Sequence, residues 1–303
     1  MTTPVISIVC DVYNHAAFLR QCLDGFMMQQ TSYPYEILIH DDASTDESQQ
    51  IIKEYENKYP TIIKPIYQTE NKYSKGISIW RDYQFPRALG KYIAICEGDD
   101  YWNDPLKLEK QISFLEAHTN YSLSYTKANV FNNSLQQFED YILGKEKTSY
   151  FDLLKSNEIP ALSVCIKTKI VKEYADKFLK NKRWKMGDYP LWLYASSKDK
   201  IHFLDEVCCV YRVLQSSSSH HNSYEESLTF NKDLLDIKAT ILQQRPLSYT
   251  KRWIVFNETY FMILESIMKY HQSKGAINYF LKAIPYNKRT RKIWWYFLKK
   301  CIF

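Results

Sequence analysis

The sequence lacks three features that would place it outside the ordinary globular enzymes: a membrane span, a secretory signal and a strong positive charge. No stretch reaches the roughly 18–20 uncharged apolar residues that a transmembrane helix needs. The opening Met1-Thr2-Thr3-Pro4 has neither the basic region nor the apolar core of a secretory signal, so we expect none. The net charge of +6 over 303 residues is only mildly positive, which argues against nucleic acid as a partner. A phosphate-bearing substrate or an anionic membrane surface accounts for this excess equally well.

Cysteine motifs are missing too. The seven cysteines form no C-x-x-C pair, and most of them lie in apolar runs. An odd number of thiols in such surroundings indicates reduced, structural cysteines in a cytosolic protein. The adjacent Cys208 and Cys209 leave a redox pair as the minor alternative. We therefore expect a cytoplasmic location.

What the sequence does contain is an alternation of short apolar runs and amphipathic segments over the first 130 residues. Strands are expected at residues 5–10, 36–40, 62–67 and 92–96, with helices after them, one of them over 76–88. Three of the helices have start signals, which are Asn14, the capping box Ser44 to Glu47, and Asp104-Pro105. This alternation predicts an α/β fold in which helices flank a mostly parallel sheet.

Acidic residues follow three of these strands: Asp11, then Asp41-Asp42, then Glu97-Gly98-Asp99-Asp100. Ligands of such sheets bind beyond the carboxyl ends of the strands. In the last group, three carboxylates within four residues repel one another unless a cation compensates, and Mg²⁺ or Mn²⁺ binds through one or two carboxylates plus substrate phosphates. Gly98 permits a tight turn. The position after a buried strand favours a metal site over the alternative, a solvated turn.

Four segments, taken in order, resemble glycosyltransferase family 2, the inverting sugar-nucleotide enzymes of the GT-A fold. They are Val5 to Asn14, Asp41 to Asp46, Glu70-Asn71 with Gly76 and Arg81, and Gly90-Lys91-Tyr92 leading into Glu97 to Asp100. The resemblance covers about the first 130 residues. It implies a GT-A, Rossmann-like sheet flanked by helices, a nucleotide-sugar donor and a divalent metal, Mn²⁺ or Mg²⁺.

The resemblance also implies roles for the matching positions. Asp42, with Asp41 beside it, would meet the base, and Tyr13 would lie against the base or ribose. Asp99 would bind the metal and the β-phosphate, and Glu97 the ribose side, although Glu is a departure from the family's D-x-D motif. Asp11, Arg81 and Asp100 complete the expected nucleotide-sugar site.

Two later positions extend the predicted site. Asp188, in Gly187-Asp188-Tyr189-Pro190, matches the acid that serves the family as catalytic base, with Gly where Glu is common. It would deprotonate the acceptor hydroxyl, and helix capping is the alternative. His220, beside Ser216 to Ser219 and downstream of Arg212, would complete the metal shell or touch the phosphate. An exposed loop histidine is the alternative there.

The chain is expected to comprise a GT-A domain over residues 1–220 and a helical C-terminal region over 221–303. Within the first, residues 1–130 would bind the nucleotide and 131–220 the acceptor. The C-terminal end places basic residues around Ile293 to Leu298, which suits an interfacial helix on the anionic inner leaflet of a membrane. A terminal helix docked on the domain is the alternative.

We therefore predict a metal-dependent inverting glycosyltransferase that transfers sugar from a nucleotide-sugar, with UDP-sugar favoured. The acceptor would be a saccharide or a lipid-linked sugar in cell-surface polysaccharide synthesis, and the location cytoplasmic or peripheral at the cytoplasmic membrane face. A nucleotidyltransferase is the first alternative, but the segment Cys10 to Asn14 lacks its Gly-rich, basic phosphate loop. A non-catalytic sugar-nucleotide-binding protein is the second, against which the joint presence of Asp42, Asp99 and Asp188 argues.

Overall fold

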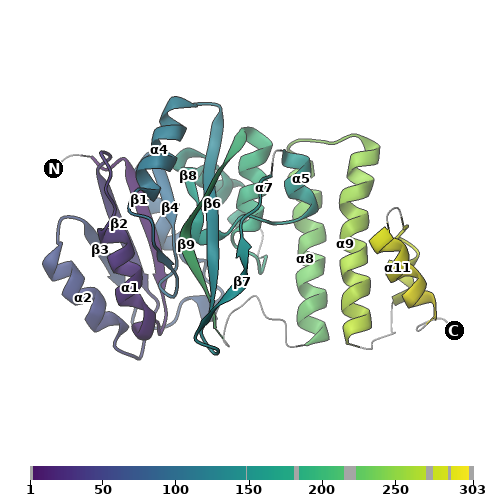
Figure 1. Ribbon diagram of the computed structural model, residues 1–303, viewed down its shortest axis with the longest axis horizontal. Coiled ribbons are helices and arrows are strands. Elements are labelled where there is room, and N and C mark those ends of the chain that lie inside the picture. Colours follow the sequence, from purple (N-terminus) through teal and green to yellow (C-terminus); the bar gives the residue numbers. More distant parts are fainter. Residues whose placement is uncertain are drawn as a thin grey trace. The chain divides into compact units, whose positions relative to one another are not determined.

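The computed structural model describes residues 3–147, 149–180, 184–214, 223–270, 276–285 and 288–299. The chain divides into two compact units (Figure 1). The first unit comprises Met1–Thr148, Glu158–Arg183 and Tyr194–Gln215, and the second comprises Ser149–Asn157, Trp184–Leu193 and Ser216–Phe303.

The first unit is built on one sheet, whose strands stand in the order β3-β2-β1-β4-β8-β6-β9-β5, with β7 paired to β6. The strands β3, β2, β1 and β4 are mutually parallel, and β6 is parallel to β9, while β8 runs antiparallel to both β4 and β6. Their bounds are β1 Ile6–Val12, β2 Tyr35–Asp41, β3 Ile63–Tyr67, β4 Tyr92–Ile95, β5 Tyr101–Trp102, β6 Tyr121–Asn132, β7 Gln137–Leu143, β8 Cys165–Lys167 and β9 Lys200–Val213. The prediction of helices around a mostly parallel sheet is confirmed.

Helices of the first unit bury the faces that the apolar spacing predicts. They are α1 Ala16–Met27, α2 Ser48–Lys58, α3 Phe85–Arg87, α4 Lys107–Ala117 and α6 Thr168–Tyr174. Figure 1 shows α1 and α2 side by side, and both contribute to one hydrophobic core. Leu19, Leu23 and Phe26 of α1 are fully buried in it, as are Leu108, Ile112 and Leu115 of α4.

Two of the predicted helix starts are wrong, and the reason is tertiary. Asn14 does not cap α1, because its side-chain oxygen accepts a hydrogen bond from the Thr45 backbone N–H instead. Ser44 does not cap α2, which begins at Ser48; its hydroxyl accepts from the backbone N–H of Asn14. The Asp104 signal lies close to α4, where its carboxylate accepts from the Leu106 N–H. The segment expected as one helix over 76–88 is broken into a π-turn, Trp80–Gln84, and the short α3.

The second unit is helical, with α5 Tyr150–Lys155, the first residues of α7 Tyr189–Lys198, α8 Tyr224–Leu242, α9 Tyr249–Lys269, α10 Ala276–Phe280 and α11 Lys288–Phe297. Helices α8 and α9 pack along each other (Figure 1), and Ser227 of α8 hydrogen-bonds Ser266 of α9 at 2.8 Å. Lys238 is fully buried between them, where its ammonium group donates to the Thr259 hydroxyl at 2.9 Å. No helix among the described residues is both long and apolar enough to cross a membrane.

Candidate functional site

The predicted acids of the first unit converge where the strand order reverses. Strand β1 has β2 on one side and β4 on the other, so the strand order turns back at β1, which is where sheets of this kind bind their ligands. Backbone hydrogen bonds tie the ends of these strands together, from Gly98 N–H to the Asp11 carbonyl at 3.0 Å and from Asp42 N–H to the Val12 carbonyl at 2.9 Å. The structure therefore gathers the three acidic groups at one edge.

The acidic turn after β4 holds three carboxylates, Glu97, Asp99 and Asp100, in different surroundings. Asp100 is buried and accepts a hydrogen bond from the Arg212 backbone N–H at 2.7 Å. Burial, with the neighbouring charge of Asp99, raises the pKa of Asp100 well above its usual value. Asp99 lies half-buried, and its Oδ1 atom is enclosed without a hydrogen-bond partner among the described residues. Glu97 is exposed. Asp99 is thus the member of the turn whose carboxylate keeps an enclosed oxygen without a hydrogen-bond partner among the described residues.

Arg212, which the sequence placed only beside a polar loop, proves to be the main support of this turn. Its side chain is buried, donates to the backbone carbonyl of Asp99 and to the side-chain oxygen of Gln21, and lies between two aromatic rings. Its guanidinium carbon is 5.1 Å from the centre of the Phe18 ring and 4.6 Å from that of Tyr101. No sequence signal identifies this role, because Arg212 stands in β9, far along the chain from the turn.

The paired acids after β2 have separate partners. The Asp42 carboxylate accepts the backbone N–H groups of Lys72 and Tyr73 at 2.7 and 3.0 Å, and so holds the segment after β3. Asp41 is fully buried; its Oδ1 accepts from Gln49 at 2.6 Å and from the Ser44 N–H at 3.1 Å. The Asp41 Oδ2 atom has no partner among the residues described. Both side chains are therefore buried at the end of β2.

Asp11 and Tyr13 lie at the β1 end. The Asp11 carboxylate accepts a hydrogen bond from Gln84 at 2.8 Å, and burial raises its pKa to about 6 despite that bond and the charge of Arg87. Tyr13 is 46% exposed, so its ring is accessible to a base or ribose. The Arg81 guanidinium donates hydrogen bonds to the Asp82 carboxylate and to the Leu179 carbonyl, at 2.6 Å in each case. Its predicted contact with the nucleotide stays a prediction.

The loops that carry Tyr13 and Asp42 are joined by side chains. Asn14 and Ala43 both have positive φ, 57° and 64°, a conformation that non-glycine residues seldom adopt. The Asp46 carboxylate accepts the Ala16 N–H and the Ser48 hydroxyl accepts the His15 N–H, both at 2.9 Å. Helix α1 is therefore capped from the loop after β2, about 30 residues away along the chain.

Asp188 belongs to the second unit. It precedes α7, and its carbonyl accepts the N–H groups of Leu191 and Trp192 at 3.0 and 3.1 Å. Burial raises the pKa of its carboxyl group, opposed by hydrogen bonds that include one from Asn157. A position at the start of a helix suits a structural residue, and a raised pKa suits a base. Its role as the catalytic base therefore stays a prediction. His220, the predicted metal ligand, lies outside the described residues.

The residues of the first unit suit a divalent cation at the acidic turn. The Asp99 carboxylate has an enclosed oxygen without a partner among the described residues. Besides burial, the negative charges of Asp99 and Glu97 raise the pKa of Asp100, and a bound divalent cation would offset this repulsion. A second group of ligand-type atoms, on Asp104, Glu206 and Cys208, already surrounds an ammonium group. Lys110 pairs there with both carboxylates, at 2.8 Å from that of Asp104. That group is therefore an ion-paired surface cluster.

A model of the family described as glycosyl transferase family 2 matches residues 7–178, which is more than half of the chain. The uncharacterized protein Rv1520 of Mycobacterium tuberculosis is 44% identical over 115 residues, which are 37% of this chain and 32% of that protein. The chain thus aligns with about a third of the length of this relative. The putative teichuronic acid biosynthesis glycosyltransferase TuaG of Bacillus subtilis is 27% identical over 71% of this chain and 82% of its own.

Another relative is the Escherichia coli UDP-Glc:alpha-D-GlcNAc-diphosphoundecaprenol beta-1,3-glucosyltransferase WfgD, 28% identical over 73% of this chain and 82% of its own. Among solved structures, S. aureus TarS in complex with UDP-GlcNAc superposes with a TM-score of 0.65 at 18% identity, covering 95% of this chain and 78% of that one. The mannosyltransferase PcManGT of Pyrobaculum calidifontis, in complex with GDP-Man and Mn²⁺, gives 0.60 at 13% identity, over 100% and 82%. At these identities the likeness shows the shared fold.

Proposed function

Because the chain belongs to glycosyl transferase family 2, we propose that it is a metal-dependent inverting glycosyltransferase that uses a UDP-sugar. The observation that carries the proposal is the convergence of Asp11, Asp42 and Asp99 at the ends of β1, β2 and β4, on segments joined by backbone hydrogen bonds. Family membership sets aside the nucleotidyltransferase alternative. The non-catalytic alternative is left to the experiment below.

Each part of the donor has a candidate partner at these strand ends. The exposed ring of Tyr13 offers a stacking face for the base. Asp42, which also holds the Lys72 and Tyr73 N–H groups, is proposed to meet the base, with Asp41 buried beside it. Glu97, exposed at the start of the acidic turn, is assigned to the ribose hydroxyls, with Asp100 behind it as support. Asp99 would hold Mn²⁺ or Mg²⁺, which supplies positive charge to the leaving diphosphate. A neighbour of the same fold is in complex with GDP-Man and Mn²⁺, which supports a metal without fixing its identity.

Asp188 is the proposed catalytic base, which takes the proton of the acceptor hydroxyl as that oxygen attacks the anomeric carbon. A carboxylate with a raised pKa holds a proton more strongly, and so accepts one more readily than an ordinary aspartate. Attack from the face opposite the leaving diphosphate inverts the anomeric centre. The names of two relatives support an acceptor class, because TuaG is named for teichuronic acid biosynthesis and WfgD for a diphosphoundecaprenol-linked acceptor. We propose a saccharide or lipid-linked acceptor in cell-surface polysaccharide synthesis.

A thermal-shift screen of nucleotide-sugars with and without Mn²⁺ tests the donor. A bound donor at a hundredfold excess over its dissociation constant stabilises the fold by roughly 2.7 kcal/mol. We expect stabilisation by UDP and UDP-sugars that needs Mn²⁺ and is lost in Asp99→Asn. Stabilisation by GDP-Man alone would overturn the UDP assignment. Binding without any Mn²⁺-dependent hydrolysis or transfer, with every acceptor tested, would favour the non-catalytic alternative.

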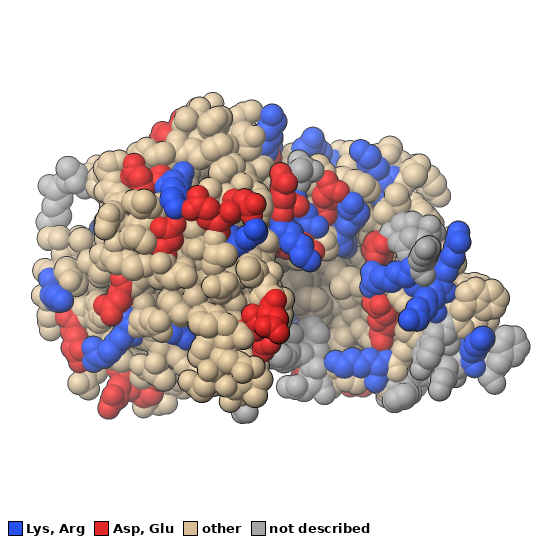
Figure 2. Space-filling model, in the orientation of Figure 1, with Lys and Arg blue, Asp and Glu red and all other residues tan. Residues whose placement is uncertain are grey.

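The surface of the second unit supports a membrane-facing role. Helix α11 is docked on its unit through the buried Thr290 and Ile293, and the Trp294 ring stacks on Phe280 at 4.9 Å. Its other face leaves Trp295 59% exposed, on the same helix as the exposed Arg291 and Lys292. Figure 2 shows Lys and Arg in blue on the surface of this unit. The helix therefore combines a docked face with a free aromatic and basic face.

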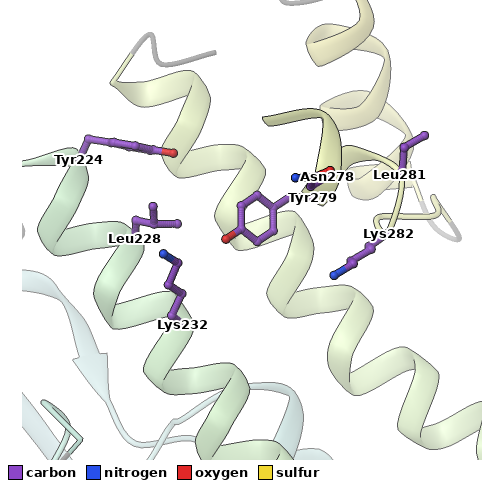
Figure 3. Close-up of a pocket in the computed structure, with 7 residues that line it drawn as sticks. All are labelled: Tyr224, Leu228, Lys232, Asn278, Tyr279, Leu281 and Lys282. Atoms are coloured by element: carbon purple, nitrogen blue, oxygen red, sulfur yellow. The ribbon is translucent and has the colours of Figure 1, made fainter. Parts of the chain in front are cut away.

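A groove of about 560 Å³ opens on the same unit, with Lys232 of α8 and Lys282 after α10 on its walls. Figure 3 shows the ring of Tyr279 between these two lysine side chains in projection. Neither ammonium group has a carboxylate partner among the described residues, and Leu281 beside them is 71% exposed. Cations next to exposed apolar groups suit a phosphate headgroup at a bilayer surface. We propose that this face contacts the anionic inner leaflet, at the cytoplasmic side.

Flotation with vesicles of phosphatidylglycerol, against vesicles of phosphatidylcholine, tests this contact on the full chain. We expect flotation with the anionic vesicles alone, reduced by high salt and by Arg291→Glu with Trp295→Glu. Lys58→Glu, on the exposed surface of α2, is the control and should float as the wild type does. Equal flotation of all variants, or none with either vesicle, would refute membrane contact by this face and leave the glycosyltransferase assignment untouched.

A further inference from the structure

Two buried polar atoms of the first unit lie beside the acidic turn without hydrogen-bond partners. They are Nδ1 of His15 and Oδ1 of Asp99, and neither has a partner within the described part of the chain. Buried polar atoms in folded proteins are nearly always paired, and each exception calls for an explanation. Leaving such an atom unpaired costs about 1–3 kcal/mol. Two of them on facing loops of the same site indicate an interaction that is made when the site is loaded.

The main chain of His15 is held firmly on both sides. Its N–H donates to the Ser48 hydroxyl at 2.9 Å, and its carbonyl accepts the N–H groups of Phe18 and Leu19, also at 2.9 Å. The residue therefore has a fixed place at the start of α1, and only its side-chain torsions are free to adjust. A small rotation of the imidazole is the movement that this arrangement permits.

The imidazole lies directly against the acidic turn. A Cβ atom built on Gly98 would be 2.9 Å from His15 Nδ1, and 3.0 Å from Cγ2 of Val12. The first distance is shorter than real Cβ atoms show, so a side chain at position 98 would push the imidazole away from its present place. The next residue along the turn is Asp99, whose negative charge acts on the imidazole together with those of Asp41 and Asp46.

We propose that His15 is a positioning residue for Asp99. Its Nδ1–H donates a hydrogen bond to one oxygen of the Asp99 carboxylate and turns the other oxygen toward the divalent cation. Carboxylates that bind metals are commonly held by such hydrogen bonds, and loss of the supporting group weakens metal binding. The inference rests on the proposed function, because it takes Asp99 to be the metal ligand. It gives a role beyond the start of α1 to a histidine that the motifs of the sequence do not single out.

Two substitutions separate this role from a structural one. In His15→Asn the amide nitrogen stands in for Nδ1 and keeps an N–H donor near the same position, whereas His15→Leu fills similar space without a donor. The readout is Mn²⁺ affinity in the presence of UDP, measured by electron paramagnetic resonance of free Mn²⁺. We expect affinity to fall about 10–100-fold in His15→Leu, and to stay near the wild-type value in His15→Asn. His118→Leu, at the exposed end of α4, is the matched control and should leave Mn²⁺ affinity unchanged.

The possible results are distinguishable. Wild-type Mn²⁺ affinity in His15→Leu, or equal losses in His15→Leu and His15→Asn, would overturn the positioning role. Nitrogen hyperfine coupling of His15 to the bound Mn²⁺ would overturn it too, because the imidazole would then be a ligand. If the wild type binds no Mn²⁺ with UDP, the metal assignment of the proposed function fails instead. Thermal unfolding of each variant shows that the chain is folded, and His15→Asn keeps the test open if His15→Leu does not fold.

Discussion

Removing the guanidinium of Arg212 should loosen the acidic turn and destabilise the first unit. Arg212→Met keeps most of the apolar stem between Phe18 and Tyr101, and it keeps the backbone bond from position 212 to Asp100. It deletes the charged donors to the Asp99 carbonyl and to the Gln21 side-chain oxygen, of which the second belongs to an exposed residue. Losing a hydrogen bond made by a charged donor costs about 1.5–3 kcal/mol, which we take as the expected loss in the free energy of unfolding.

Urea denaturation followed by tryptophan fluorescence measures this loss, and the same variant should bind Mn²⁺ with UDP more weakly. Arg20→Met is the matched control, because Arg20 stands on α1 of the same unit with an exposed ion pair to Glu54. Exposed substitutions of this kind usually stay within about 0.5 kcal/mol of the wild type. A loss in Arg212→Met no larger than that of the control would refute the reasoning, because it would mean that the turn holds its shape without the guanidinium.

Three further predictions concern single titratable groups. Asp188→Asn should abolish transfer while the thermal shift by UDP with Mn²⁺ remains, and wild-type kcat should fall as pH drops through the raised pKa of Asp188; near-normal turnover of the variant would exclude it as the base. The pKa of Asp11 is about 6 in the folded state, against an ordinary value of 3.8, so the folded state binds more protons between these pH values. The free energy of unfolding should therefore decline as pH rises from about 4 to 6, and urea titrations of Asp11→Asn should lack that decline. The pKa of Lys238 is about 7 in the folded state, against an ordinary value of 10.5, so the unfolded state binds more protons between these pH values and the free energy of unfolding should rise with pH. Lys238→Met should remove this pH dependence, and an unchanged pH dependence would show that the buried amine is not its source.

The sequence predicted the sheet and the placement of the acids well, because both depend on local pattern. Apolar runs such as Tyr92 to Cys96 are buried strands, and the acids that follow them converge because parallel strands end at the same edge. The prediction of an α/β sheet with family 2 likeness is confirmed by the fold and by the family match. The individual roles of Asp42, Glu97 and Asp99 stay predictions, since they concern a donor.

What the sequence did not reveal depends on contacts between distant segments. Asn14 and Ser44 are residue types that often cap helices, but the side chain of each accepts a hydrogen bond from the loop that carries the other. The Ala16 N–H at the start of α1 is bound by Asp46 instead. Arg212 supports Asp99 from more than a hundred residues away. Capping propensity is local, and it yields when a neighbouring loop offers a better partner for the same atoms. Such exchanges have no periodicity that a single sequence could display.

The joined loops after β1 and β2 have a consequence for redesign of this protein. The N–H groups at the start of α1 are bound by Asp46 of the β2–α2 loop and by Ser48, the first residue of α2, so neither loop is an independent module. Exchanging the β2–α2 loop alone for that of a relative would remove a hydrogen-bond partner at the start of α1. Exchanging the β1–α1 loop alone would remove Asn14, and with it the hydrogen bond that its side chain accepts from the Thr45 N–H. Chimeras meant to alter base preference should therefore transfer both loops as one cassette.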